Sequence, residues 1–180
     1  MFWTHVIVSL AEFALMAAMT GVIIYFIYRM FVRANPDFDM EEEIKKNNLA
    51  VGILMFSIMI AGSIVLYRGM GGIVDMLRLH AGAPGQTGLN WWQLAGLFVI
   101  HVTVALIMAV FTISVALRLF GKMTRKAMHA GKELQNGNVA VGLVLSAVVL
   151  IAALFVGSGV NSVSRALVPQ LKIAQVEVME

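Results

Sequence analysis

The chain has 180 residues, of which 60% are hydrophobic and only 13% are charged. A soluble domain usually carries about 25% charged residues, so this composition indicates a membrane protein. No cysteine is present, which excludes disulfide frameworks, thiolate metal sites and cysteine nucleophiles. The formal net charge of +3 does not indicate nucleic-acid binding, because basic residues at membrane helix ends serve orientation and contact with anionic lipid.

Four apolar segments are each long enough to cross a bilayer core of about 30 Å, which needs roughly 20 helical residues. In chain order they run from about 4 to 28, 49 to 67, 92 to 119 and 139 to 163. Backbone polar groups in lipid must be paired within the segment, so a helix is expected for each. The predicted fold class is an all-α membrane protein with four transmembrane helices.

The first predicted span is bounded by aromatic rings and contains a carboxyl group. Trp3 opens it and Tyr28 closes it, and such rings prefer the headgroup level. Glu12 lies about eight residues inside, where a carboxylate costs on the order of 2.5–3.5 kcal/mol on insertion scales and marks a candidate functional site. The segment lacks the basic start and cleavage site of a secretory signal, so we expect it to be retained.

The second span follows a polar, acidic segment and precedes a glycine-rich stretch. Residues 72–80 present an apolar helical face, which predicts a short helix on the outer membrane surface. The first structural unit is therefore expected to cover residues 1–80. Residues 81–91 then form a connector to the second half.

The third span opens with Trp91 and Trp92 and carries His101 at nearly the depth of Glu12. We expect Glu12 and His101 to face the bundle interior and approach each other. The alternative is that each side chain is satisfied separately within the core. A basic segment follows, whose expected lipid-interface residues are Lys122, Arg125 and Lys126.

The chain repeats itself at an offset of ninety residues. Residues 43–52 align with residues 133–142, and five of the ten positions are identical: Glu, Asn, Ala, Val and Gly. The same offset superposes spans one and two on spans three and four. The sequence therefore predicts two helical hairpins, residues 1–80 and 92–168, as a parallel tandem repeat. Residues 169–180 are left as an outer tail, either a short strand or a frayed end.

Each copy of the repeated motif places a Glu five residues before an Asn at the start of a span, as Glu43 with Asn48 and Glu133 with Asn138. One interpretation is structural, because an acidic group near a helix N-terminus complements the dipole and Asn caps helices or bridges them. The other is functional: a polar constriction or a cation-binding mouth. Both interpretations stay open on the sequence.

This motif, twice over in a chain of four predicted spans, resembles the bacterial family called domain of unknown function 350 (YjfL-like). The resemblance covers nearly the whole chain, with two departures: Asn47 stands opposite Gly137, and the segment before the first motif is unusually acidic. It implies a bacterial inner-membrane protein without an established reaction. The family's association with phage-shock-type membrane-stress proteins implies a role in membrane maintenance.

Orientation follows from the Lys and Arg residues. Nine of the thirteen lie between spans one and two or between spans three and four, and four lie on the other side. The richer side is expected in the cytoplasm, with both termini outside.

No nucleotide-binding, hydrolase or kinase fingerprint is present, so we expect no enzyme activity, no catalytic residues and no cofactor. The His residues lack metal-ligand spacing, so no metal site is expected. The preferred function is an oligomeric membrane scaffold or envelope-stress component. A small ion or proton channel using Glu12 and His101, and a membrane anchor for a larger complex, remain as alternatives. Expected partners are membrane lipid and either further copies of the chain or other subunits, with no nucleic acid.

Overall fold

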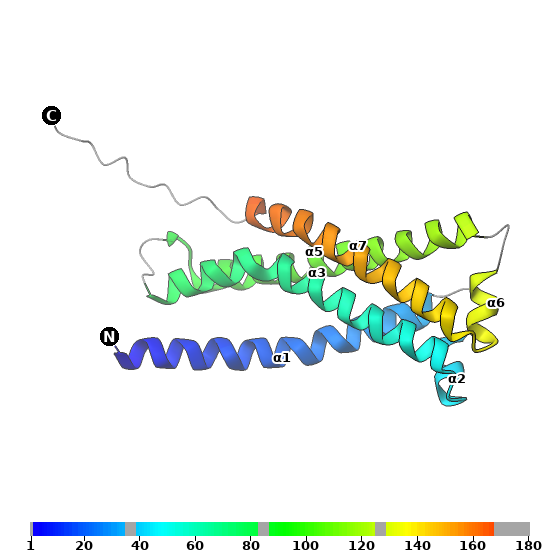
Figure 1. Ribbon diagram of the computed structural model, residues 1–180. Coiled ribbons are helices and arrows are strands. Elements are labelled where there is room, and N and C mark those ends of the chain that lie inside the picture. The colour runs from blue at the N-terminus through cyan, green and yellow to red at the C-terminus, as the bar shows by residue number, and fades with distance from the viewer. Residues whose placement is uncertain (1, 35–38, 83–86, 125–128, 168–180) are drawn as a thin grey trace.

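The computed structural model describes residues 2–34, 39–82, 87–124 and 129–167, apart from the side chains of several α1 residues. The elements assigned in these residues are all helices (Figure 1), which confirms the all-α prediction. The long helices are α1 (Phe2–Ala34), α3 (Leu49–Gly82), α5 (Trp91–Thr124) and α7 (Val139–Leu167). The short helices are α2 (Met40–Lys45) and α6 (Ala130–Gln135).

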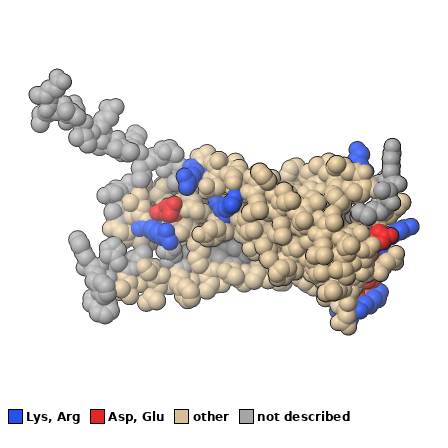
Figure 2. All heavy atoms as spheres, in the orientation of Figure 1, with Lys and Arg blue, Asp and Glu red and all other residues tan. Residues whose placement is uncertain are grey.

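The four long helices run alternately between the two ends of the molecule (Figure 1). Both short helices, α2 and α6, lie at one end, which we call the α2/α6 end. The start of α1, the end of α3 and the start of α5 lie at the opposite end. Charged side chains gather toward the two ends, and a broad uncharged band separates them (Figure 2). This distribution suits a protein whose middle lies in lipid.

Three helices in the described part of the chain, α3, α5 and α7, are long and apolar enough to cross a membrane. They begin at or within one residue of the predicted span starts at 49, 92 and 139. The first predicted span lies within α1, a continuous helix of 33 residues.

The structure differs from the prediction at residues 72–80. No separate surface helix forms there, because α3 continues without a break to Gly82. Glycines usually weaken a helix by about 1 kcal/mol each, but Gly69 serves close packing instead. A Cβ at Gly69 would lie 2.7 Å from Cβ of Ala105 and 3.0 Å from Cγ1 of Val160. The packing of α5 and α7 against this stretch stabilises the helix across its glycines.

The main core lies where α3 packs against α7, its most extensive partner, with α5 against both. The buried residues there are almost all aliphatic, including Ile58, Val65, Ile113 and Val149. α1 meets α3 through Ile27 and Phe31 near its C-terminal end. Elsewhere α1 exposes large apolar side chains, including Ile7, Leu10 and Phe13. Lipid tails are as apolar as these side chains, so such a surface suits a bilayer.

Candidate functional site: the two Glu–Asn turns

The first Glu–Asn turn, residues 43–48, joins α2 to α3. The N–H of Asn47 donates to the Ile44 carbonyl and the N–H of Asn48 donates to the Glu43 carbonyl, both at 3.0 Å. This pair of bonds is a Schellman motif, which needs one residue in the left-handed region. Asn47 supplies it with φ of 59°. The motif folds position 48 back onto position 43, which explains the five-residue spacing of Glu and Asn.

The second Glu–Asn turn, residues 133–138, has the same backbone. The N–H of Gly137 donates to the Leu134 carbonyl at 3.0 Å, and that of Asn138 donates to the Glu133 carbonyl at 2.9 Å. Gly137 has φ of 80°. Gly and Asn are the residues that adopt this region most readily. The difference between Asn47 and Gly137 therefore preserves the turn.

Each motif Asn also begins the next long helix. Oδ1 of Asn48 accepts hydrogen bonds from the N–H groups of Ala50 at 3.1 Å and Val51 at 3.3 Å. Oδ1 of Asn138 accepts from the N–H of Val141 at 3.4 Å. The first N–H groups of a helix lack partners within it, and Asn is among the best residues to cap them. One residue thus ends a short helix and starts a long one.

Glu43 is buried within the first turn, with 6% of its surface exposed. Its Oε2 accepts from Nδ2 of Asn48 at 3.0 Å, and its Oε1 accepts from Nζ of Lys46 at 3.2 Å. These bonds, that of Asn48 first, hold the pKa of Glu43 below its ordinary value of 4.5. Lys46 also pairs with Glu42 at 2.9 Å, and this bond is the main cause that raises the pKa of Lys46. The turn therefore favours charged Glu43.

Asn48 also joins the two halves of the chain. Its Nδ2 lies 2.9 Å from the Leu134 carbonyl and 3.2 Å from the Gln135 carbonyl, to which it donates. The last carbonyls of a helix lack partners within it, so Asn48 satisfies the end of α6. Asn138 has the same place in the second turn, yet among the described residues its Nδ2 donates only to Oε2 of Glu133, at 2.9 Å. The two turns share a geometry and differ in what they contact.

His101 is buried on α5, with 1% of its surface exposed. Its Nδ1 lies 2.8 Å from the Leu97 carbonyl in its own helix, and its Nε2 lies 3.1 Å from the Ser164 carbonyl on α7. A neutral ring donates to one of these carbonyls and a protonated ring to both. The side chain of Glu12 lies outside the described residues, so its pairing with His101 stays a prediction.

The predicted lipid-interface residues lie near helix ends where the structure describes them. Trp91 and Trp92 begin α5 and are 60% and 87% exposed, and Lys122 is exposed near its end. The Trp91 ring also meets the His80 ring edge-on, with centroids 4.5 Å apart. Tyr28 on α1 is half-buried. Outside the described residues lie the Trp3 side chain, Arg125 and Lys126.

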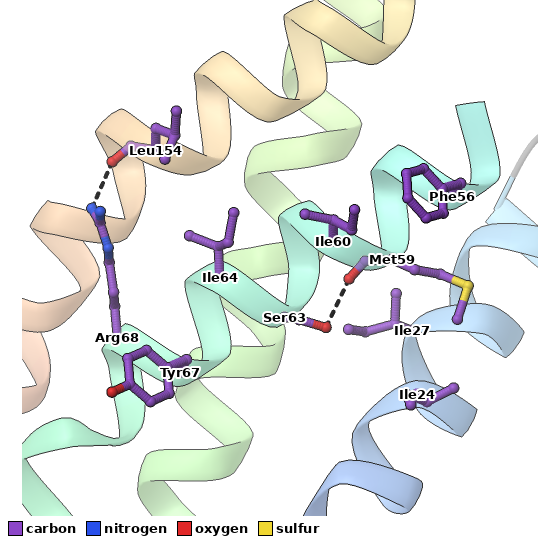
Figure 3. Close-up of a pocket in the computed structure, with 10 residues that line it drawn as sticks. All are labelled: Ile24, Ile27, Phe56, Met59, Ile60, Ser63, Ile64, Tyr67, Arg68 and Leu154. Carbon is purple, nitrogen blue, oxygen red and sulfur yellow. Dashed lines mark hydrogen bonds between the residues drawn. The ribbon is translucent and has the colours of Figure 1, made fainter. Parts of the chain in front are cut away.

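The sequence predicts no contact for Arg68, which is one of the four Lys and Arg residues expected on the outer side. Its Nη1 donates to the Leu154 carbonyl and to Oγ of Ser158, both at 2.8 Å, so the guanidinium lies against α7 (Figure 3). Gly157 makes room for it, because a Cβ there would lie 2.9 Å from Cδ of Arg68. The sequence holds no local signal for this contact, because Arg68 and Ser158 are ninety residues apart.

Arg68 follows Leu49, the first residue of α3, by nineteen residues, or about 28 Å of helix. A bilayer core is about 30 Å thick. With the start of α3 at one face of the core, Arg68 reaches the other face.

The described residues hold no cluster of three or more His, Asp or Glu that suits a metal ion. Apolar helices of membrane-spanning length, charges at the two ends and buried polar groups bonded to helix carbonyls define an α-helical membrane protein. Within that class, the model of the family described as Domain of Unknown Function (DUF350) matches residues 1–160, and the chain belongs to this family. The resemblance seen in the sequence is confirmed. No curated protein and no solved structure matches the chain.

Proposed function

We propose that the chain is a non-enzymatic scaffold that crosses the bacterial inner membrane four times. The observation that carries this proposal is that buried or partly buried polar side chains bond to the backbone of neighbouring helices. Asn48, Arg68 and His101 each approach a backbone carbonyl of another helix within hydrogen-bond distance. Such bonds hold helices together, and they suit a rigid helical body better than a reaction centre.

In this proposal α1 is the fourth span, since its 33 residues exceed the roughly 20 that a bilayer core needs. The α2/α6 end lies in the cytoplasm, because nine of the thirteen Lys and Arg residues lie between spans one and two or between spans three and four. Both termini then lie outside.

The chain is further proposed to be a tandem duplication. The starts of α3 and α7 are ninety residues apart, and so are both bounds of α2 and α6. Five backbone hydrogen bonds in and beside the first turn recur in and beside the second at the same offset. The two that close each turn, donated by Asn47 and Asn48 and by Gly137 and Asn138, agree in length within 0.1 Å. A local geometry repeated at one offset supports two copies of one hairpin.

Single-cysteine labelling tests this topology, because the chain has no cysteine of its own. Lys45→Cys and Gln135→Cys, both exposed at the α2/α6 end, should react with a membrane-impermeant maleimide only after the membrane is opened. Thr4→Cys and Gly82→Cys should react in intact spheroplasts. Labelling of Thr4→Cys from the same side as Lys45→Cys would show that α1 does not cross the membrane. Labelling of Lys45→Cys and Gln135→Cys from opposite sides would overturn the topology altogether.

A further inference from the structure

α3 and α7 meet through different faces of the same repeated helix. The buried residues of α3 on the side of this contact include Ala50, Leu54, Ser57 and Ala61. The buried residues of α7 include Gly142, Ser146, Val149 and Ala153. Ninety residues earlier these α7 positions become 52, 56, 59 and 63, which lie on the opposite side of the helix at roughly 100° per residue. The contact is therefore heterologous: it joins one face of the first unit to the opposite face of the second.

Both kinds of face occur a second time, uncovered within the described chain. On α3 the counterparts of the buried α7 face include Phe56, 65% exposed, and Tyr67, 80% exposed. On α7 the counterparts of the buried α3 face include Val144, Ile151 and Phe155, which are 46%, 56% and 78% exposed. Each chain thus presents one open face of each kind.

Equivalent glycines of the two units also differ in whether another helix packs against them. A Cβ at Gly142 would lie 2.7 Å from the Ala50 carbonyl oxygen, whereas one at its counterpart Gly52 meets no described atom beyond its own stretch of helix within 4 Å. Gly69 is closely packed against α5 and α7, whereas its counterpart Gly159 again meets nothing within 4 Å in the described part. Each unit carries two glycines for close approach, and the chain uses one of each pair.

The Glu–Asn turns show the same asymmetry. Asn48 donates to the last carbonyls of α6. The counterpart of that bridge would run from Asn138 to the carbonyls of Ile44 and Lys45 at the end of α2. No such bond is formed within the described chain. Like the second pair of helix faces, the second bridge lacks its partner.

The uncovered face of α3 forms one wall of an apolar groove of about 680 Å³ (Figure 3). Phe56, Ile60 and Tyr67 line it from α3, and Ile24 and Ile27 line it from α1. A groove of this kind needs a long apolar occupant, such as a helix.

We infer that the occupant is α7 of a second copy of this chain, which packs on α3 in the way that α3 packs on α7 within one chain. The internal contact shows that these two faces fit, since the groove wall is the repeat counterpart of a face already buried there. Ala140 of one copy then meets Gly52 of the next, and Asn138 reaches the Ile44 and Lys45 carbonyls. Such head-to-tail contacts close into a ring when the rotation per copy permits. The inference rests on the proposed topology, because both hairpins must cross the membrane in the same direction.

Cross-linking between two differently tagged copies tests this contact. Ser146 Oγ donates to the Ile53 carbonyl at 3.2 Å within one chain, so the counterpart pair between chains is Leu143 with Phe56. Both side chains are more than half exposed, at 55% and 65%, so Phe56→Cys and Leu143→Cys should leave folding intact. Co-expressed in one membrane, the two copies should form a mixed product with a short bismaleimide. Phe111→Cys, 66% exposed on α5, is the control partner for Phe56→Cys and should yield at least 10-fold less.

Matched glycine variants provide the second arm. Gly52→Leu should lower the cross-linking yield at least 10-fold while leaving thermal unfolding in detergent unchanged. Gly142→Leu, at the same repeat position, should impair folding itself. Equal yields from the Leu143 and Phe111 partners, or an unchanged yield in Gly52→Leu, would overturn the inference. A monomer with phospholipid bound, seen by native mass spectrometry from lipid nanodiscs, would do the same. None of these results would change the cysteine-labelling pattern that tests the topology. Failure of the assembly and failure of the topology are therefore distinguishable.

Discussion

Nδ2 of Asn48 donates to the Leu134 carbonyl across 2.9 Å, and this bond joins residues 86 positions apart. It ties the first turn to the end of α6, where the second turn begins. Because Asn48 also caps α3, one side chain couples the start of a long helix to the opposite half of the chain. The counterpart Asn138 lacks this second task in the described chain.

Alanine substitution should separate the two tasks. Asn48→Ala removes a helix cap and the bridge to α6, so we expect a loss of about 2–4 kcal/mol in unfolding free energy. Asn138→Ala removes a cap and the bond to Glu133, so we expect about 1–2 kcal/mol. Reversible unfolding in mixed micelles measures both. Equal losses would contradict the asymmetry of the turns.

Protonation of Glu43 should weaken the first turn. Its pKa is lower in the folded protein than its ordinary value of 4.5, so its stabilising contribution is present above that value. The contribution is lost as the pH falls through the lower, folded-state pKa. We expect the difference in unfolding free energy between wild type and Glu43→Gln to shrink as the pH is lowered from 6 to 3.

Glu41→Gln is the control for that titration, because Glu41 lies on the same short helix with its side chain 49% exposed. Its difference from wild type should change less over the same pH range. A gap between wild type and Glu43→Gln that stays constant with pH would show that the Glu43 charge does not stabilise the turn.

Substitution of the residue with left-handed backbone conformation should destabilise the second turn and leave the first turn nearly unchanged. Gly137→Ala forces a Cβ into φ of 80° and should cost about 1–2 kcal/mol. Asn47→Gly keeps the φ of 59° accessible and should change stability by less than about 0.5 kcal/mol. Chemical unfolding of the purified variants compares them. A tolerated Gly137→Ala would show that the second turn relaxes.

Arg68 should act as a clamp between α3 and α7. Arg68→Met removes the bonds to Leu154 and Ser158 while keeping an apolar stem, so we expect a loss of about 1–3 kcal/mol. Ser158→Ala removes one of the two bonds and should cost about 0.6 kcal/mol, near the average for hydrogen bonds between membrane helices. In the double variant the Ser158 substitution should cost less than it does alone, because its bond to Arg68 is already gone and only its 3.4 Å bond to the Leu154 carbonyl remains. Full additivity would argue against the contact.

The scaffold proposal predicts no proton or ion flux through the protein in liposomes at any pH between 5 and 8. His101→Leu should lower stability by about 1 kcal/mol through loss of its contact with the Ser164 carbonyl, and flux should stay at the lipid background. A pH-dependent flux in wild type that Glu12→Gln abolishes would replace the scaffold by the channel alternative.

Features that depend only on neighbouring residues could be predicted from the amino-acid sequence. Apolar blocks of sufficient length predicted the long helices, and their starts at Leu49 and Val139 follow from a cap one residue earlier. The repeat at ninety residues located both Glu–Asn turns, because each turn closes through hydrogen bonds within six residues. The left-handed backbone conformation at Asn47 and Gly137 likewise depends only on neighbouring residues.

Which of two equivalent groups makes a contact depends on how the helices pack, and the sequence alone does not predict it. α3 continues past residue 72 because Gly69 packs against Ala105 and Val160, and a glycine read alone indicates a helix break. The choice of Asn48 over Asn138 as the bridge, and the reach of Arg68 to α7, depend on partners 86 to 90 positions away. In the proposed tandem duplication, each helix face and each cap occurs twice. Packing one copy against the other covers one of each and leaves its counterpart open, and this asymmetry exists only in three dimensions.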